Sequence, residues 1–133
     1  MARWAILYDR DCGFCRWSLA VVLRGDRGRM LRPVALQDPE ADRLLAGMTE
    51  EERMASSHLV GPDGAVATAG AAAAPLFRLL PGWRPLAALA ARFPRATERA
   101  YRWVADHRGL FGRFVTQAAK RRADRLIEAR RGS

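Results

Sequence analysis

The hydrophobic pattern opens with a short apolar run from Trp4 to Tyr8 that ends abruptly in Asp9-Arg10-Asp11. Its aromatic and β-branched residues predict a buried strand that leads into a loop. From Phe14 to Leu23 the chain is apolar on nearly every side, and glycines follow it. This second run predicts a helix that is covered on both sides and stopped by a glycine-containing turn.

Two further elements follow before residue 55. Residues 31–36 are typical of a second strand, and Pro33 inside it favours either the edge of a sheet or an irregular pairing. Asp38-Pro39-Glu40 is typical of a helix start, and that helix is expected to run to about Ala46. Residues 49–54 resemble another capped helical turn.

Residues 57–68 predict a β-hairpin, with two short strands on either side of Gly61-Pro62-Asp63-Gly64. After Gly70 the pattern is helical almost to its end, with breaks at residues 81–82 and 93–94. One helix is expected to start near Thr97. The residues expected to share its face are Tyr101, Val104, Ala105 and Arg108. Those expected to share a face of the last helix are Phe111, Phe114, Val115, Ala118 and Ala119.

The predicted order β-α-β-α-β-β-α, with a Cys-x-x-Cys at the first strand–helix junction, is typical of a thioredoxin-like plan. We therefore expect an α/β fold with a small central mixed sheet and additional C-terminal helices. A chain of 133 residues is one domain by length. We assign residues 1–118 to this domain with its helical extension, and residues 119–133 to a basic, frayed helical tail.

Composition changes this picture little. Half of the residues are hydrophobic, and the formal net charge of +9 is almost all arginine, because Lys120 is the one lysine. We interpret the arginine and alanine content as codon bias in a GC-rich bacterial genome, although an acidic partner could exploit the charge. No secretory signal and no membrane-spanning stretch is recognisable, so the expected location is a reducing cytoplasm. In that compartment a close cysteine pair indicates catalysis or metal binding rather than a scaffold disulfide.

The candidate chemistry lies in Cys12-Gly13-Phe14-Cys15. A cysteine at a helix N-terminus is favoured as a thiolate, because unpaired N–H groups and the helix dipole face it. Cys15 shares a face with Leu19 and Val22, so it is expected to be the more buried thiol. We therefore assign Cys12 as the nucleophile and Cys15 as the resolving thiol.

Asp9 and Asp11 precede the nucleophile closely enough to oppose its thiolate. A carboxylate about 6 Å away costs ~0.7 kcal/mol in water and ~3 kcal/mol at an effective dielectric of about 20. The N-terminus of a helix stabilises a nearby anion by only about 0.3–2 kcal/mol. The motif therefore does not by itself predict a strongly acidic Cys12.

The segment from Tyr8 to Cys15 resembles the motif of the DCC family of predicted thiol–disulfide oxidoreductases, approximately aromatic-Asp-Gly-Asp-Cys-x-x-Cys. The hairpin, residues 79–81 and residues 101–108 also resemble that family, so the similarity covers roughly residues 4–114. The resemblance implies a thioredoxin-like fold and a dithiol site in which Cys12 and Cys15 match the family's cysteines. Asp9 and Asp11 match its acids. Membership implies little about the substrate; we expect a disulfide-containing protein or a small-molecule thiol, an external reductant and no bound cofactor.

Two positions depart from the pattern. Arg10 stands where the family usually has glycine. No proline precedes Ser57 or His58, where thioredoxins place a cis-proline facing the disulfide; Ser56 or Ser57 takes that place. The second departure argues against a thioredoxin-style peptide groove and a general protein-disulfide reductase role.

Other readings of the same residues remain open. The cysteines could be small buried hydrophobic residues, or zinc ligands if His58 and His107 completed the site. Asp9-x-Asp11 after a strand also resembles the Asp-x-Asp motif of haloacid-dehalogenase phosphatases. Those enzymes also need a lysine, and the one lysine in this sequence is Lys120.

A binding role is the stronger alternative. In this interpretation the arginine-rich last helix, with Trp103 and Phe114 nearby, contacts nucleic acid or an anionic membrane surface, and the cysteine pair is structural or redox-sensing.

Overall fold

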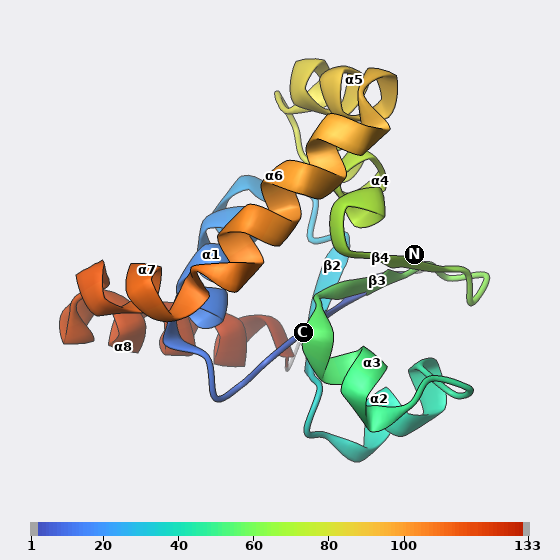
Figure 1. The fold of residues 1–133 in the computed structure, drawn as a ribbon. Coiled ribbons are helices and arrows are strands. Elements are labelled where there is room, and N and C mark those ends of the chain that lie inside the picture. The colour runs from blue at the N-terminus through green and yellow to red at the C-terminus, as the bar shows by residue number, and fades with distance from the viewer. Residues whose placement is uncertain (1–2, 132–133) are drawn as a thin grey trace.

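A four-stranded mixed sheet forms the centre of the molecule, which is described here from a computed structural model for residues 3–131 (Figure 1). The strands are β1 (Trp4–Tyr8), β2 (Leu31–Ala35), β3 (His58–Val60) and β4 (Val66–Thr68). Their order across the sheet is β2-β1-β3-β4; β1 pairs parallel with β2, and the other pairs are antiparallel. Pro33 lies opposite Ile6 on β2, so the predicted edge position is confirmed.

Helices cover both faces of this sheet (Figure 1). They are α1 (Gly13–Gly25), α2 (Pro39–Leu44), α3 (Glu50–Ala55), the 3-10 helix η1 (Ala69–Ala72), α4 (Ala73–Leu79), α5 (Arg84–Arg92), α6 (Pro94–Asp106), α7 (Arg108–Phe114) and α8 (Gln117–Arg131). Side chains of β1 alternate between two cores, as a strand covered on both faces requires. Ile6 and Tyr8 pack with residues of α1 and α8, whereas Ala5 and Leu7 pack toward α2 and α3. The thioredoxin-like α/β arrangement expected from the sequence is confirmed.

Local signals predicted several element boundaries, although α6 begins at Pro94 instead of near Thr97, and α2 ends at Leu44 instead of near Ala46. Thr49 and Glu52 form the predicted capping box at the start of α3. Proline stands in the first turn of α2, α5 and α6. The predicted hairpin is formed by β3 and β4.

Helix α6 is held close to the sheet through the turn at Gly70. A Cβ atom at Gly70 would lie 2.6 Å from the Cα of Glu98, so only glycine permits this approach. The Gly70 N–H donates to the Glu98 carboxylate at 2.9 Å. The same helix carries the hydroxyl of Tyr101 to the backbone N–H of Ser57, at 2.7 Å.

The predicted frayed tail is instead a docked helix, α8, which packs along α1 through the buried side chains of Ala123 and Ile127. At its end, Arg130 donates to the Leu23 carbonyl at 3.2 Å and pairs with the fully buried Asp26. The prediction failed because the apolar residues of α8 are few and spaced among arginines. They are nevertheless enough to cover the second apolar side of α1.

The C-terminal helices are also divided differently from the prediction. Helix α6 ends at Asp106, so Arg108 belongs to α7 and not to the helix of Tyr101. Val115 has an extended backbone that separates α7 from α8, so Phe111 and Ala119 lie on different helices. Within residues 3–131, no helix has the length and apolar character needed to cross a membrane.

Candidate active site

Cys12 occupies the N-cap position of α1, directly after the loop that leaves β1. Its backbone is extended, and its sulfur accepts the N–H of Cys15 at 3.2 Å. A free N–H of the first turn is thereby used by sulfur in place of the oxygen of an ordinary capping residue. The strand-to-helix junction thus places one thiol at the positive end of the helix and the other one turn further on.

This position makes Cys12 acidic. The hydrogen bond from the Cys15 thiol, followed by that from the Cys15 N–H and by the charge of Arg108, lowers the pKa of Cys12 to about 6. Burial and the charge of Asp9 oppose the shift without reversing it. The carboxylate repulsion expected from the sequence is real, but it is outweighed by contacts that spacing alone does not reveal.

Cys15 has the opposite character. Its hydrogen bond to Cys12 and then its burial raise the pKa of its thiol above the ordinary value. It lines an apolar cavity of about 200 Å³ together with Leu19, Val22 and Leu76. The thiol of Cys15 is therefore kept protonated beside an anionic Cys12.

Asp9 and Asp11 differ in their surroundings. Asp9 accepts the Asp11 N–H at 2.9 Å and the side-chain amide of Gln37 at 2.8 Å, and this stiffens the loop before Cys12. Asp11 is exposed, and its contact with Gln37 is longer, at 3.4 Å. The sequence analysis did not single out Gln37. Its place after β2 was a usable signal, since the ends of parallel neighbouring strands meet at one edge of a sheet.

Arg10 fits the loop without a left-handed backbone. Among residues 3–131 the non-glycine residues with positive φ are Arg29 and Ala69. The Arg10 N–H donates to the side-chain oxygen of Gln37 at 3.1 Å, so the departure from glycine is accommodated.

Ser57 lies near the dithiol, where it lines two cavities together with Cys15. The peptide bonds within residues 3–131 are all trans. The backbone N–H of Ser57 already donates to the Tyr101 hydroxyl, and residues of α6 line one of these two cavities. This backbone donor is therefore occupied, and an incoming peptide would have to displace Tyr101 to pair with it.

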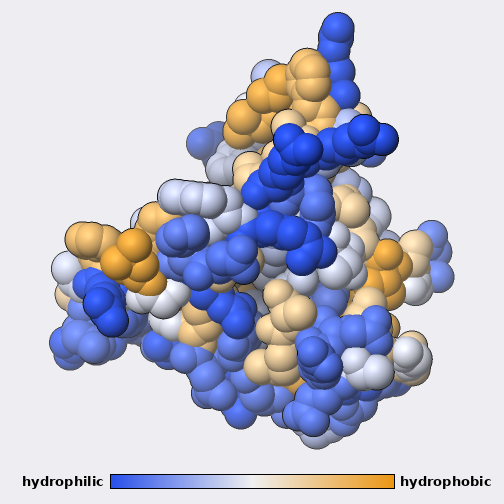
Figure 2. All heavy atoms as spheres, in the orientation of Figure 1, coloured by the Kyte–Doolittle hydropathy of each residue, from blue (hydrophilic) through white to orange (hydrophobic). Residues whose placement is uncertain are grey.

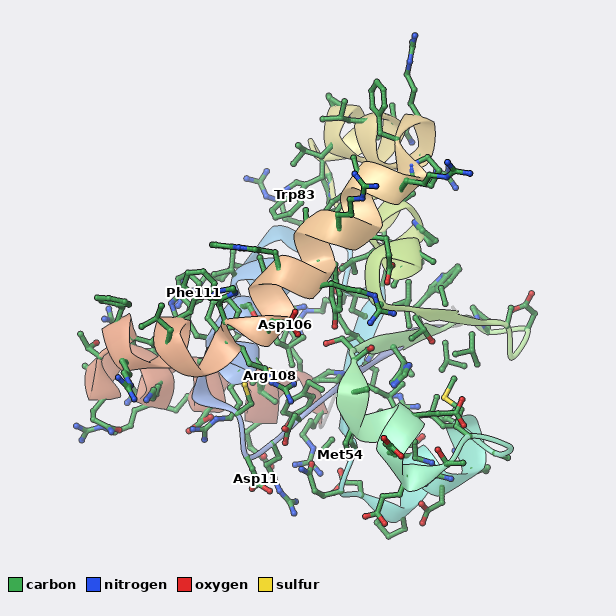
Figure 3. The ribbon with its side chains drawn as sticks, viewed as in Figure 1. Asp11, Met54, Trp83, Asp106, Arg108 and Phe111 are labelled. Carbon is green, nitrogen blue, oxygen red and sulfur yellow. The ribbon has the colours of Figure 1, made fainter. Side chains whose placement is uncertain are left out.

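Three basic side chains surround the other side of the dithiol. Arg108 and Arg113 of α7 and Lys120 of α8 line a cavity of about 490 Å³ with Cys12; we call these three side chains the basic mouth. Figure 3 shows Arg108 where α6 meets α7, beside the start of α1. Sequence reasoning missed this group and assigned Lys120 to the tail, because the docking of α8 has no local signal.

The two histidines are bonded elsewhere. The ring nitrogens of His58 contact the Thr68 hydroxyl at 2.9 Å and the Arg53 carbonyl at 3.0 Å. His107 bonds to the Trp103 carbonyl through Nδ1 and stacks on its indole ring. In residues 3–131 no three His, Cys, Asp or Glu side chains are grouped as metal ligands. The geometry gives no support to the zinc interpretation.

Comparison with known proteins agrees with this arrangement. The sequence model of the DCC1-like thiol-disulfide oxidoreductase family matches residues 6–114, which make up most of the chain and include both cysteines. Searches of curated proteins and of solved structures found no significant match. With a strand–helix junction that carries two neighbouring thiols and a family match over more than a hundred residues, the chain belongs to the DCC1-like thiol-disulfide oxidoreductase family.

Proposed function

We propose that the protein exchanges electrons with a disulfide substrate through Cys12 and Cys15. The observation that carries this proposal is the pairing of an acidic Cys12, at the N-terminus of α1, with a protonated Cys15 one turn away. A low pKa makes the Cys12 thiolate the form present at neutral pH, and the thiolate is the attacking species. Cys15 supplies the second thiol.

The reaction proceeds in two steps. The Cys12 thiolate attacks one sulfur of the substrate, the substrate S–S bond breaks, and a thiolate leaves with the electron pair of that bond. Cys15 then gives its proton to the departed substrate thiolate and attacks the Cys12 sulfur; the Cys12–Cys15 disulfide forms, and the second half of the substrate leaves as a thiolate that takes a proton from water. Two electrons pass from the dithiol to the substrate. An external thiol reductant returns the protein to its starting state.

The aspartates support this role from the preceding loop. We assign Asp9 the task of ordering residues 9–11 through its bonds to Asp11 and Gln37. Its charge also keeps the pKa of Cys12 from falling further. A thiolate that is too weakly basic is a poorer nucleophile, so this restraint favours exchange at neutral pH.

The arginine-rich helix has less support as a binding surface. Arg130 pairs with Asp26, and Arg131 pairs with Asp38 at 3.0 Å. The apolar side of the same helix is packed against α1. Much of α8 therefore serves the fold.

The test separates the two thiols. With a neutral disulfide and an external dithiol reductant, Cys12→Ser is expected to abolish turnover. Cys15→Ser should retain one round of attack and accumulate the mixed disulfide on Cys12, visible as a mass increase equal to one half of the substrate. Preferential iodoacetamide labelling of Cys15 in the reduced protein, or activity in Cys12→Ser, would reverse the assigned roles.

A further inference from the structure

Within residues 3–131, no ion pair with a carboxylate neutralises the basic mouth. Two other arginines near α1 do have carboxylate partners: Arg16 pairs with Asp124 at 3.2 Å, and Arg130 pairs with Asp26. Residues 3–131 place no carboxylate within ion-pair distance of the three basic residues of the mouth. Asp11 is the one acid that lines the same cavity. The space in front of Cys12 is therefore cationic.

Lys120 is brought to this space by a specific packing contact. A Cβ atom at Gly13 would lie 2.8 Å from Cε and 3.2 Å from Nζ of Lys120, so the lysine side chain crosses the first turn of α1 at a glycine. Gly13 follows Cys12 directly, and Lys120 and Cys12 line the same cavity. Lys120 lies outside the stretch that matches the family. The lysine therefore comes from a part of the chain that the family match does not cover.

The shape of the site favours a small substrate over an extended peptide. The Ser57 N–H is bonded to Tyr101, so the backbone donor next to the dithiol is occupied. The depression at Cys12 is open to solvent, and its volume of about 490 Å³ falls within the range of small-molecule sites. A compact disulfide could enter it without displacing α6.

We propose that the substrate is a low-molecular-weight disulfide bearing carboxylate groups, and that Lys120 determines this specificity by pairing with one carboxylate. This inference rests on the proposed thiol–disulfide exchange. In the attack, the bond between Cys12 and the near sulfur forms as the substrate S–S bond breaks, and the electron pair leaves with the far thiolate. Arg108 and Arg113 face that developing negative charge. An external dithiol reductant then reduces the Cys12–Cys15 disulfide and is itself oxidised to a disulfide.

Three disulfides of similar size test the specificity: dithiodipropionate (anionic), hydroxyethyl disulfide (neutral) and cystamine (cationic). Each kcat/KM is divided by the rate at which free 2-mercaptoethanol attacks the same compound, which removes intrinsic reactivity. At low salt the normalised value is expected to be about tenfold higher for the anionic than for the neutral disulfide, and lowest for the cationic one. Raising the salt concentration should reduce the difference in normalised kcat/KM between the anionic and the neutral disulfide. Equal normalised values would overturn the inference.

The matched variants are Lys120→Met and Arg121→Met, which remove the same charge from neighbouring positions of α8. Arg121 is exposed and does not line the mouth. Lys120→Met should lower the anionic-to-neutral ratio by about threefold or more, and Arg121→Met should leave that ratio unchanged. Equal effects of the two variants would assign the preference to overall charge and overturn the role of Lys120. If none of the three disulfides is turned over, the proposed exchange itself is wrong.

Discussion

The pKa of Cys12 is lowered mainly by its partner thiol, and charged residues around it modulate that shift. Hydrogen bonds from Cys15 dominate the lowering of its pKa, Arg108 adds to it, and Asp9 acts against it. Of the two carboxylates before the motif, Asp9 supplies the stronger opposing charge, although Asp11 is adjacent in sequence. Distance along the chain is a poor guide here, because Asp11 is turned outward and exposed.

Asp9→Asn is therefore expected to lower the pKa of Cys12 below about 6. Asparagine removes the charge that disfavours the thiolate and keeps an oxygen that can accept the Asp11 N–H. The pH dependence of alkylation of the reduced protein by iodoacetamide gives the midpoint directly. Asp11→Asn, the matched control, should shift this midpoint less. A higher midpoint in Asp9→Asn would mean that Asp9 acts through loop order and not through charge.

At the scale of elements, His58 ties β3 to its neighbours. Its side chain is buried, with 1 % exposure, and it contacts Thr68 of β4 and the end of α3. Nε2 faces a carbonyl oxygen and therefore carries the proton, so Nδ1 accepts from the Thr68 hydroxyl. Burial lowers the pKa of His58 and holds the ring neutral. The residue is a structural part of the hairpin.

His58→Leu is expected to lower the free energy of unfolding by about 2 kcal/mol, because two hydrogen bonds are lost and the Arg53 carbonyl is left buried without that donor. The depressed pKa means that stability falls as pH drops below about 6.5, where the unfolded histidine takes up a proton. This acid-side fall should diminish in the variant. Urea unfolding at pH 7 and pH 5, in a Cys12→Ser background that removes thiolate titration, measures both effects. In the control variant His107→Leu, the free energy of unfolding should still fall between pH 7 and pH 5.

At the scale of the whole molecule, α8 joins the fold to the site. Its buried residues cover α1, its last turn caps the end of α1 through Arg130, and its first turns carry Lys120 to Gly13 at the start of α1. The opposite end of the molecule, at α5, exposes hydrophobic side chains (Figure 2). Those exposed on α5 are Leu86 and Leu89. Neither lines a cavity at the dithiol, so that tip is separate from the site.

Ile127→Ala is expected to destabilise the protein by about 2–4 kcal/mol, because its side chain is 3 % exposed and belongs to the main core cluster. Arg125→Ala, at an exposed position of the same helix, should stay within about 0.5 kcal/mol of the parent. Chemical denaturation of both variants gives the comparison. A small effect of Ile127→Ala would support a frayed tail over a docked helix.

The sequence by itself determined the elements whose signals are local. The apolar run of β1, the capping box at Thr49, the edge proline of β2 and the Pro-Asp-Gly hairpin each depend on residues within a few positions of one another. The signal for the dithiol is equally local, because a Cys-x-x-Cys at a strand–helix junction places both thiols on one helical turn. For the same reason the family could be identified from the Tyr8–Cys15 motif.

Only the tertiary structure decided what surrounds the dithiol. Arg16 and Asp124 are 108 positions apart, yet their pairing helps to place α8 and hence Lys120. Gln37 reaches Asp9 because β1 and β2 are parallel, and Tyr101 reaches Ser57 because Gly70 admits α6. Such contacts depend on how whole helices pack, and the free energy that selects the packing comes from buried surfaces far apart in the chain. No short sequence pattern predicts how these helices pack, so the cationic surroundings of Cys12 are evident only in the tertiary structure.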